Sequence, residues 1–331
     1  MRIEDTIRLT DGVLQNFPSV TQTESIKIDP NTVKRGDLFL DTKNSFEDQK
    51  TALENGAFAI ISEKILEILD SEIAWIEVDS LRLASIKLSR YEFSKKNSKI
   101  FYLDGISQEI LHLITKNQEF TELSSNTYTA LITIKKSGEN TKYTCSDERL
   151  AFSIDPDCQK VDEECDIQKF KPKSPFYSSF ICDENFCQEL KIPMIFADRV
   201  CKITKFLKKQ EIYYNLTSIC LEKHFSPLFV DYNLNKKEFG QSEKVIIFEQ
   251  SIDFLDSEIK YLYNFSKEFI VCVPKRYRNY FSNYQNIFLF SSFDELKDLL
   301  KRNIRYILVF GEKKSYEMNF KSKKLTCRSF F

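Results

Sequence analysis

One segment, residues 26–63, constrains the fold of this chain more than any other. Residues 34–37 read Lys-Arg-Gly-Asp, which suits a tight turn that needs a glycine backbone, and Leu38–Leu40 begin an apolar strand. A short helical stretch follows and ends at Gly56, where helices commonly close in the left-handed conformation. Ala57–Ile61 is an apolar run short enough for a buried strand. This order of elements predicts an α/β domain.

The alternation of strands and helices continues and is most regular toward the C-terminal end. Short strands separated by helices predict parallel β-α-β units there, and Ser292 with Glu295 forms a capping box before one of these helices. Strands are expected at 75–78, 100–103, 127–134, 228–230, 245–248, 269–273, 287–290 and 306–310, and helices at 65–69, from about 80, and at 106–115.

These patterns divide the 331 residues into three parts, in line with the usual size of domains. We expect a first domain at 1–98, a second at 99–225 and a third at 226–331. The third should be a Rossmann-like domain with a parallel sheet, and the second is the least regular. Within it, the charged run 155–175 is expected to be a solvated or mobile surface loop, because a calcium loop would need a glycine and a regular ligand spacing.

Charge and hydropathy exclude several classes of partner. Lys and Arg total 48 against 49 for Asp and Glu, so the net charge of −1 gives no electrostatic attraction to nucleic acid or to an anionic membrane. No stretch approaches the roughly 20 apolar residues that span a bilayer. We therefore expect a cytoplasmic globular protein that binds no nucleic acid and does not insert into a membrane.

The nine cysteines predict reduced, mostly buried thiols. Their number is odd, they are scattered from Cys145 to Cys327, and no two are separated by two residues. Only His112 and His224 could join them as ligands, and the spacing typical of a zinc site is missing. We therefore predict no metal site.

The segment 26–63 resembles the N-terminal domain of the Mur ligases, the ATP-dependent enzymes that add amino acids to UDP-N-acetylmuramoyl precursors of peptidoglycan. It is most similar to the members that attach D-alanyl-D-alanine, whose pattern has Pro-Gly-Asp-Leu-Phe and then Asn-Gly-Ala before a strand. The residues that match are Asp29, Gly36, Asp37, Leu38, Phe39, Asn55, Gly56 and Ala57.

The resemblance implies a multi-domain α/β architecture with a reduced central domain. In the family the N-terminal domain holds the UDP-sugar, so Asp29, Gly36 and Asp37 become candidate ligand-binding residues. The family's Ser-Arg pair near the nucleotide is replaced here by Pro30 and Asn31, which removes a hydroxyl, a guanidinium and a backbone donor.

The ATP-binding loop of the family is degenerate in this chain. In Mur ligases this loop follows the first strand of the central domain, and its lysine offsets the charge of the transferring phosphoryl group. Here residues 104–109 read Asp-Gly-Ile-Ser-Gln-Glu. Gly105 matches the last glycine, Ser107 could supply the hydroxyl, and Ile106 replaces the lysine. Losing one charge stabiliser typically costs about 100-fold to 1000-fold in rate, so we expect neither ATP nor magnesium as a cofactor.

Two stretches near the C-terminal end resemble the family more weakly. In residues 230–235, Asp231, Tyr232, Asn233 and Asn235 match a strand end and loop that borders the nucleotide in active ligases. A structural turn held by asparagines would have the same pattern. Residues 307–313 are similar to the family's Val-Leu-Val-Lys-Gly-Ser-Arg, with the glycine retained and the lysine and serine absent.

Three functional hypotheses follow from the resemblance. The leading one is a bacterial pseudoenzyme of the Mur ligase type, without catalytic residues, that binds a peptidoglycan precursor or another cell-wall synthesis protein. The second is an active ATP-dependent ligase with a rebuilt phosphate site, in which Gly105, Ser107, Asp231 and Asn233 take part with ATP and magnesium. The third is a structural or interaction protein without a ligand.

Overall fold

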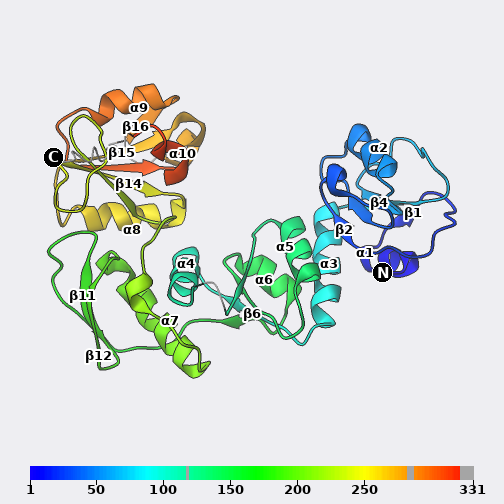
Figure 1. Ribbon diagram of the computed structural model, residues 1–331, viewed down its shortest axis with the longest axis horizontal. Coiled ribbons are helices and arrows are strands. Elements are labelled where there is room, and N and C mark those ends of the chain that lie inside the picture. Colours follow the sequence, from blue (N-terminus) through cyan, green and yellow to red (C-terminus); the bar gives the residue numbers. More distant parts are fainter. Residues whose placement is uncertain (117–118, 282–286, 321–331) are drawn as a thin grey trace, which may run out of the picture. The chain divides into compact units, whose positions relative to one another are not determined.

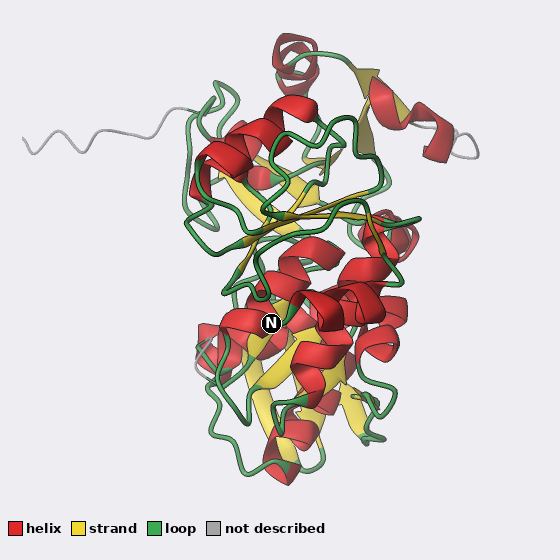
Figure 2. Cartoon of the chain, turned by 90° about the vertical axis from the view of Figure 1, so that its right-hand side faces the viewer, coloured by secondary structure: helices red, strands yellow, loops and turns green. Residues whose placement is uncertain are grey.

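The computed structural model describes residues 1–116, 119–281 and 287–320 (Figure 1). The chain forms two compact units: residues 1–108 with 117–161, and residues 109–116 with 162–331. In both, helices flank sheets that contain parallel strands, so the fold class is α/β as predicted (Figure 2). The division into three parts ending near 98 and 225 stays a prediction.

The first unit begins with a five-stranded sheet in the order β1-β5-β4-β3-β2. β2 to β5 run parallel, and β1 pairs antiparallel with β5 at the edge. β3 and β4 are buried on both faces, which explains why they read as continuous apolar runs. The bounds are α1 Ile3–Thr10, β1 Val13–Leu14, β2 Ile26–Lys27, η1 Pro30–Thr32, β3 Leu38–Leu40, α2 Phe46–Glu54, β4 Ala59–Ser62, β5 Ala74–Glu77 and α3 Leu81–Ser94.

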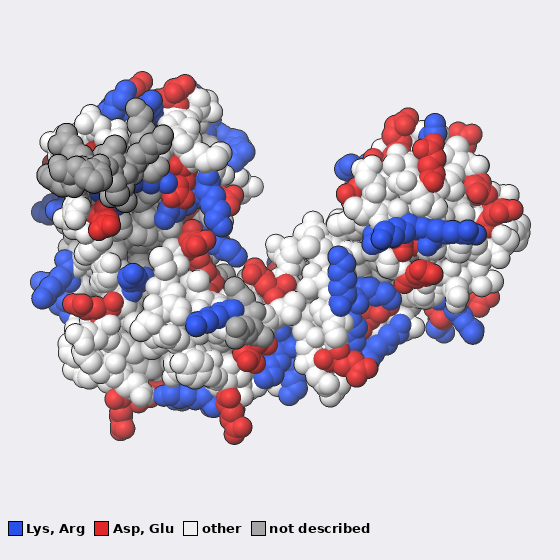
Figure 3. Space-filling model, viewed as in Figure 1, with Lys and Arg blue, Asp and Glu red and all other residues white. Residues whose placement is uncertain are grey.

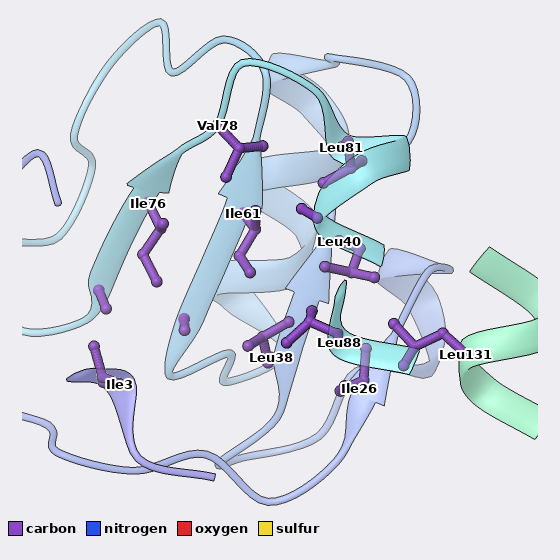
Figure 4. Packing of buried hydrophobic residues seen from close by; sticks show 13 residues of the cluster. Ile3, Ile26, Leu38, Leu40, Ile61, Ile76, Val78, Leu81, Leu88 and Leu131 are labelled. Atoms are coloured by element: carbon purple, nitrogen blue, oxygen red, sulfur yellow. The ribbon is translucent and has the colours of Figure 1, made fainter. Parts of the chain in front are cut away.

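Alternate residues of these strands face opposite layers of the first unit. Leu40 and Ile61 pack with side chains of α1 and α3 in one core cluster (Figure 4). The neighbouring residues Phe39, Ile60 and Trp75 pack on the other face, where α2 contributes to the cluster. The sheet is therefore the central layer, with α1 and α3 on one face and α2 on the other.

Two glycines in the left-handed region join the turn before β3 to the end of α2. Gly36 (φ +94°) donates its N–H to the carbonyl of Gly56 (φ +95°) at 3.0 Å. A Cβ on Gly56 would lie 3.0 Å from the Cα of Arg35, which is backbone, whereas a Cβ on Gly36 would meet only the flexible Glu24 side chain at 3.2 Å.

We expect Gly56→Ala to destabilise the first unit by about 1–3 kcal/mol, because alanine is strained at positive φ and its Cβ would press on the backbone. Gly36→Ala should cost less, since a side chain can move aside. Gly138→Ala, with nothing within 4 Å of the added Cβ, is the matched control. Denaturant unfolding followed by fluorescence of Trp75, the single tryptophan, measures the effect. Equal midpoints for Gly56→Ala and Gly138→Ala would contradict this account.

The second sheet of the first unit has the order β7-β8-β6-β9, with parallel pairs throughout. α3 packs against α1 and also against α5 and α6, so it lies between the layers of the two sheets. The strand predicted at 100–103 is confirmed as β6. The bounds are β6 Lys99–Tyr102, α4 Gly105–Ile114, β7 Thr121–Leu123, α5 Thr127–Lys136, β8 Lys142–Cys145, α6 Glu148–Ile154 and β9 Gln159–Lys160.

The prediction of a strand at 127–134 is wrong, because these residues form α5. Asn126 caps the helix by accepting two backbone N–H groups of its first turn at 3.1 and 3.0 Å. Ala130, Leu131 and Ile134 recur at helical spacing and are buried. The cap and this buried face outweigh the strand preference of the branched residues.

The helix predicted at 65–69 is also wrong. These residues lie without helix or strand between β4 and β5. Ile65 and Leu69 pack on the core cluster of Phe39 and Trp75, and the backbone N–H of Ile65 points to the carboxylate of Glu77 at 3.4 Å. Tertiary packing accounts for the apolar residues here.

The second unit begins with three antiparallel strands in the order β10-β11-β12, packed on α7. The charged run 155–175 is mostly exposed at its acidic positions, as predicted, but it contains β9 and β10. Asp162 and Glu163 form ion pairs with lysines of α7. The bounds are β10 Ile167–Lys169, β11 Ser178–Cys182, β12 Asn185–Leu190, η2 Met194–Phe196, α7 Ala197–Lys209 and η3 Leu216–Ser218.

The prediction that the cysteines are reduced is wrong for one pair. Cys182 of β11 and Cys201 of α7 form a disulfide, with a Cα–Cα distance of 5.6 Å. The fold brings them together across a strand and a helix, a contact that their spacing of 19 residues does not reveal. Cys327 lies outside the described residues. The free thiols are those of Cys145, Cys158, Cys187 and Cys272, which are buried as predicted, and of Cys165 and Cys220, which are not.

The C-terminal part of the second unit is a five-stranded sheet in the order β13-β14-β17-β15-β16. The strands predicted there are confirmed, and all neighbours run parallel except β13, which is antiparallel to β14. The capping interaction at Ser292 is present, since its hydroxyl accepts the N–H of Glu295 at 3.4 Å. The bounds are β13 Ser226–Val230, β14 Lys244–Glu249, α8 Ile252–Leu262, β15 Phe269–Pro274, η4 Lys275–Phe281, β16 Ile287–Phe290, α9 Phe293–Leu300, β17 Tyr306–Phe310 and α10 Lys313–Glu317.

Charges of both signs are interspersed on the surface. On the face in Figure 3, basic and acidic side chains alternate over short distances. This distribution agrees with the near-neutral composition. Within the described ranges, no helix has both the length and the apolar character needed to cross a membrane.

Candidate functional site

The candidate residues of the N-terminal segment hold its backbone in place. Asp37 is only 3% exposed, and its carboxylate accepts the N–H groups of Ser25 (3.3 Å) and Lys34 (3.0 Å). Asp29 caps η1 by accepting the N–H of Asn31 at 3.0 Å. Together with Gly36, they stabilise the connection between β2 and β3, which we call the frame of β2 and β3. Each has a local structural role in this arrangement.

A polar cluster that the sequence reasoning missed lies at the carboxyl end of β3. Asp41 is fully buried and accepts hydrogen bonds from the N–H groups of Lys43 and Ser45, from Gln49 Nε2 (2.8 Å) and from Ser62 Oγ (3.2 Å). An aspartate directly after a buried apolar strand is the signal that could have identified it. The cluster fixes the strand ends on the edge where ligands usually bind in open α/β sheets.

The connection between β6 and α4 consists of two residues, Leu103 and Asp104. Asp104 Oδ1 accepts the N–H of Ser107 at 2.9 Å, so a carboxylate of the chain itself takes a donor in the first turn of α4. Ile106, at the lysine position of the resemblance, is fully buried. Gly105 begins the helix. A polyphosphate would meet the negative charge of Asp104 here, and the connection is too short to supply several converging backbone donors.

The residues predicted near the nucleotide in the third part form a turn after β13. Asp231 accepts the N–H groups of Asn233 (2.9 Å) and Asn235 (2.8 Å), and Leu234 has φ +62°. Burial alone would raise the pKa of Asp231, but hydrogen bonds from Asn235, Lys237 and Asn233 outweigh it and lower this pKa. The turn therefore satisfies its own polar groups.

Tyr232 extends from this turn toward solvent, with 48% of its surface exposed. Its hydroxyl donates to Asn303 Oδ1 at 3.2 Å, and the ammonium of Lys244 lies 5.2 Å from the ring centre. The nine candidate residues thus fall into three separate local structures: the frame of β2 and β3, the start of α4, and the turn after β13.

The second unit contains a cavity of about 290 Å³ lined by residues of β13, by the first residue of α10 and by the segments that precede β11 and η2. Five of its twelve described lining residues are aromatic, and they include a Tyr177–Phe239 contact with ring centres 4.5 Å apart and a Phe176–Phe229 contact at 5.4 Å. The described lining residues are Phe176, Tyr177, Lys191, Pro193, Cys220, Leu221, Phe225, Pro227, Phe229, Glu238, Phe239 and Lys313. None of the nine candidates is among them.

Two lysines give the cavity a positive edge. Lys313 Nζ donates to the carbonyl of Pro227 (2.9 Å) and to Ser226 Oγ (3.3 Å), and Lys191 is exposed. In the described ranges, no carboxylate forms an ion pair with either ammonium. Aromatic walls with a cationic edge suit a ligand that has an apolar or flat body and an anionic group. The sequence gives no signal for this cavity, because 29 phenylalanines are spread along the chain.

One group of side chains in the described part of the chain has the composition of a metal site. Among the described residues, Cys182, Asp183 and Cys201 form the group of possible ligands that come within 4.8 Å of one another. The two sulfurs are bonded to each other as a disulfide, so neither is a thiolate that could bind zinc. His224 does not join this group, because its Nδ1 lies 2.8 Å from Glu249 Oε1.

Comparison with known proteins gives structural matches. No protein-family model matches the chain, and no curated protein matches its sequence. MurF from Acinetobacter baumannii is similar with a TM-score of 0.60 and 11% identity, over 96% of this chain and 97% of that chain. The MurF ligase from Thermotoga maritima, solved in complex with ADP, gives 0.59 and 14% identity, over 88% of this chain and 95% of that chain. This chain has the Mur ligase fold.

The Mur ligase fold confirms the architecture that residues 26–63 predicted. Both comparisons cover most of the chain, so the similarity extends far beyond the segments that suggested it. Identities of 11% and 14% establish the fold alone. The activity and the ligand must be argued from the sites.

Proposed function

We propose that this protein is a non-catalytic Mur-ligase-like factor that binds a peptidoglycan precursor or another cell-wall synthesis protein in the bacterial cytoplasm. The observation that carries the proposal is the two-residue connection before α4, where Asp104 caps the helix and Ile106 is buried. Phosphoryl transfer depends on positioned donors and cations around the phosphates. This position offers an anion and an apolar side chain instead.

The cavity of the second unit supports the binding half of the proposal. Its aromatic wall and the ammonium groups of Lys191 and Lys313 suit an anionic ligand with an apolar body. A UDP-muramoyl peptide offers anionic groups in its phosphates and carboxylates and a flat ring in its uracil.

Calorimetric titration of the full chain with ATP, ADP and magnesium tests the proposal. We expect no saturable nucleotide binding and no phosphate release when a UDP-muramoyl peptide and D-alanyl-D-alanine are added. Titration with the UDP-muramoyl peptide alone should give saturable binding that weakens in Lys313→Ala. Magnesium-dependent ATP binding with turnover would contradict the proposal that the protein is non-catalytic. Absence of precursor binding would leave a cell-wall synthesis protein as the proposed binding partner.

An active ligase remains the second candidate because one cation lies near the end of β6. Lys160 of β9 pairs in register with Tyr102, and its ammonium lies 5.5 Å from the ring centre of that residue. It also forms an ion pair with Glu148 at 3.7 Å. If ATP binds after all and Lys160→Ala abolishes this binding, a rebuilt phosphate site that includes Gly105 and Ser107 would be favoured.

A further inference from the structure

Two buried glutamates hold the backbone that leads from η3 into β13. Glu109 of α4 accepts the N–H groups of Glu222 and Lys223 through Oε1, at 2.6 and 2.9 Å. Glu249, at the end of β14, accepts the N–H of Phe225 through Oε2 at 3.1 Å. Residues 222–225, which we call the 222–225 segment, therefore depend on side-chain carboxylates for their backbone hydrogen bonds.

The 222–225 segment is part of the wall of the aromatic cavity. Leu221, next to the segment, and Phe225, its last residue, both line the cavity. Phe225 has φ +45°, a conformation that bulky residues rarely adopt, and its hydrogen bond to Glu249 stabilises it there. Displacement of the segment would therefore change the shape of the cavity.

Ionisable groups of both signs face these glutamates. Glu249 Oε1 accepts the N–H of Ser251 (2.6 Å) and lies 2.8 Å from His224 Nδ1. Glu258 of α8 is fully buried, and neither of its carboxylate oxygens has a hydrogen-bond partner within the described residues. Its carboxyl faces that of Glu249, and a hydrogen bond between the two requires that one of them carries a proton. Arg199 of α7 contributes positive charge at Glu258, and Lys223 and His224 do so at Glu109.

Burial raises the pKa of Glu109, and burial together with the charge of Glu249 raises the pKa of Glu258 well above its ordinary value of 4.5. We call the arrangement in which the 222–225 segment covers these glutamates the closed arrangement. A carboxyl with a raised pKa binds its proton more tightly in this arrangement than when solvent reaches it. The closed arrangement is therefore favoured at low pH. It loses stability as the pH rises through these raised values.

We propose that the 222–225 segment is a proton-controlled wall of the cavity: it is held in place while the carboxyl cluster, made up of Glu109 and the separate Glu249–Glu258 pair, keeps its protons, and it loosens as the pH rises. Two carboxyls in contact, away from water, cannot both ionise without separating or gaining a cation. The backbone held by this cluster would move with it. The inference does not depend on which ligand the cavity binds.

Hydrogen exchange of the full chain, read by mass spectrometry on a peptide spanning 221–226, tests this inference. After correction for the intrinsic pH dependence of exchange, the protection of this peptide should fall by up to about tenfold per pH unit for each linked proton. Peptides from β17 should keep their protection. A parallel loss in β17 would indicate global unfolding and would overturn the proposal.

Two isosteric variants separate the cluster from other titrating groups. Glu258→Gln keeps the shape but removes the shared charge, so the pH dependence of protection should become weaker. Glu109→Gln keeps an oxygen acceptor for the segment and should reduce the slope, which preserves the test if Glu258→Gln fails to fold. Glu268→Gln, at an exposed glutamate, should retain the full slope. A constant protection in the wild type, or an unchanged slope in Glu109→Gln, would sink the inference.

Discussion

Asp41→Ala should lower the free energy of unfolding of the first unit by about 3–5 kcal/mol, the largest effect that we expect from a single polar substitution there. The carboxylate accepts hydrogen bonds from four donor groups, and two of these belong to the fully buried side chains of Gln49 and Ser62. Buried donors left without a partner retain their full desolvation cost. Alanine supplies no acceptor, and the buried position limits access of water.

Denaturant unfolding followed by Trp75 fluorescence measures this effect, because the indole is fully buried in β5 of the same sheet. Asp41→Asn keeps one acceptor oxygen and should cost less, about 1–2 kcal/mol. Asp79→Ala, at an exposed aspartate near the same edge, is the matched control and should leave the midpoint nearly unchanged. A midpoint for Asp41→Ala that equals that of Asp79→Ala would show that the network contributes nothing.

Glu249→Ala should destabilise the second unit by a similar amount, about 3–5 kcal/mol. The substitution leaves the backbone N–H groups of Phe225 and Ser251 and the ring of His224 without their buried acceptor. Glu249→Gln should cost less, because its amide oxygen still accepts. The cavity wall should loosen together with this loss of stability.

Amide exchange of β14 and β17 as a function of denaturant measures this change, since the single tryptophan lies in the first unit. Glu268→Ala is the control for loss of an exposed glutamate. Unchanged exchange in β14 after Glu249→Ala would mean that water or a rearranged side chain satisfies these donors. The structural importance assigned to the carboxylate would then be wrong.

The strands were the best predicted part of the fold. β4, β14 and β17 are buried on both faces, so each appears in the sequence as a short apolar run. α5 was mistaken for a strand because residues 127–134 contain three threonines, two isoleucines and a tyrosine, and the cap at Asn126 was overlooked. Residues 65–69 are apolar because they cover Trp75, which no local pattern reveals.

The candidate sites were harder to predict than the elements. The sequence placed Asp37 in a turn and left a turn at Asp231 as one of two interpretations, but only the structure shows that these carboxylates and that of Asp29 already accept backbone hydrogen bonds. The aromatic cavity and the glutamates around the 222–225 segment join stretches more than a hundred residues apart along the chain. Such contacts depend on the packing of whole layers rather than on spacing.

The two-residue connection between β6 and α4 bears directly on the proposed function. Exchanging Ile106 for lysine would place a charged amine at a fully buried position, and it would add no further backbone amides. If the protein is non-catalytic as proposed, gaining a triphosphate site would require several inserted residues and removal of the Asp104 carboxylate as well. Under that proposal, the length of this connection, more than any single side chain, distinguishes the protein from an ATP-dependent ligase.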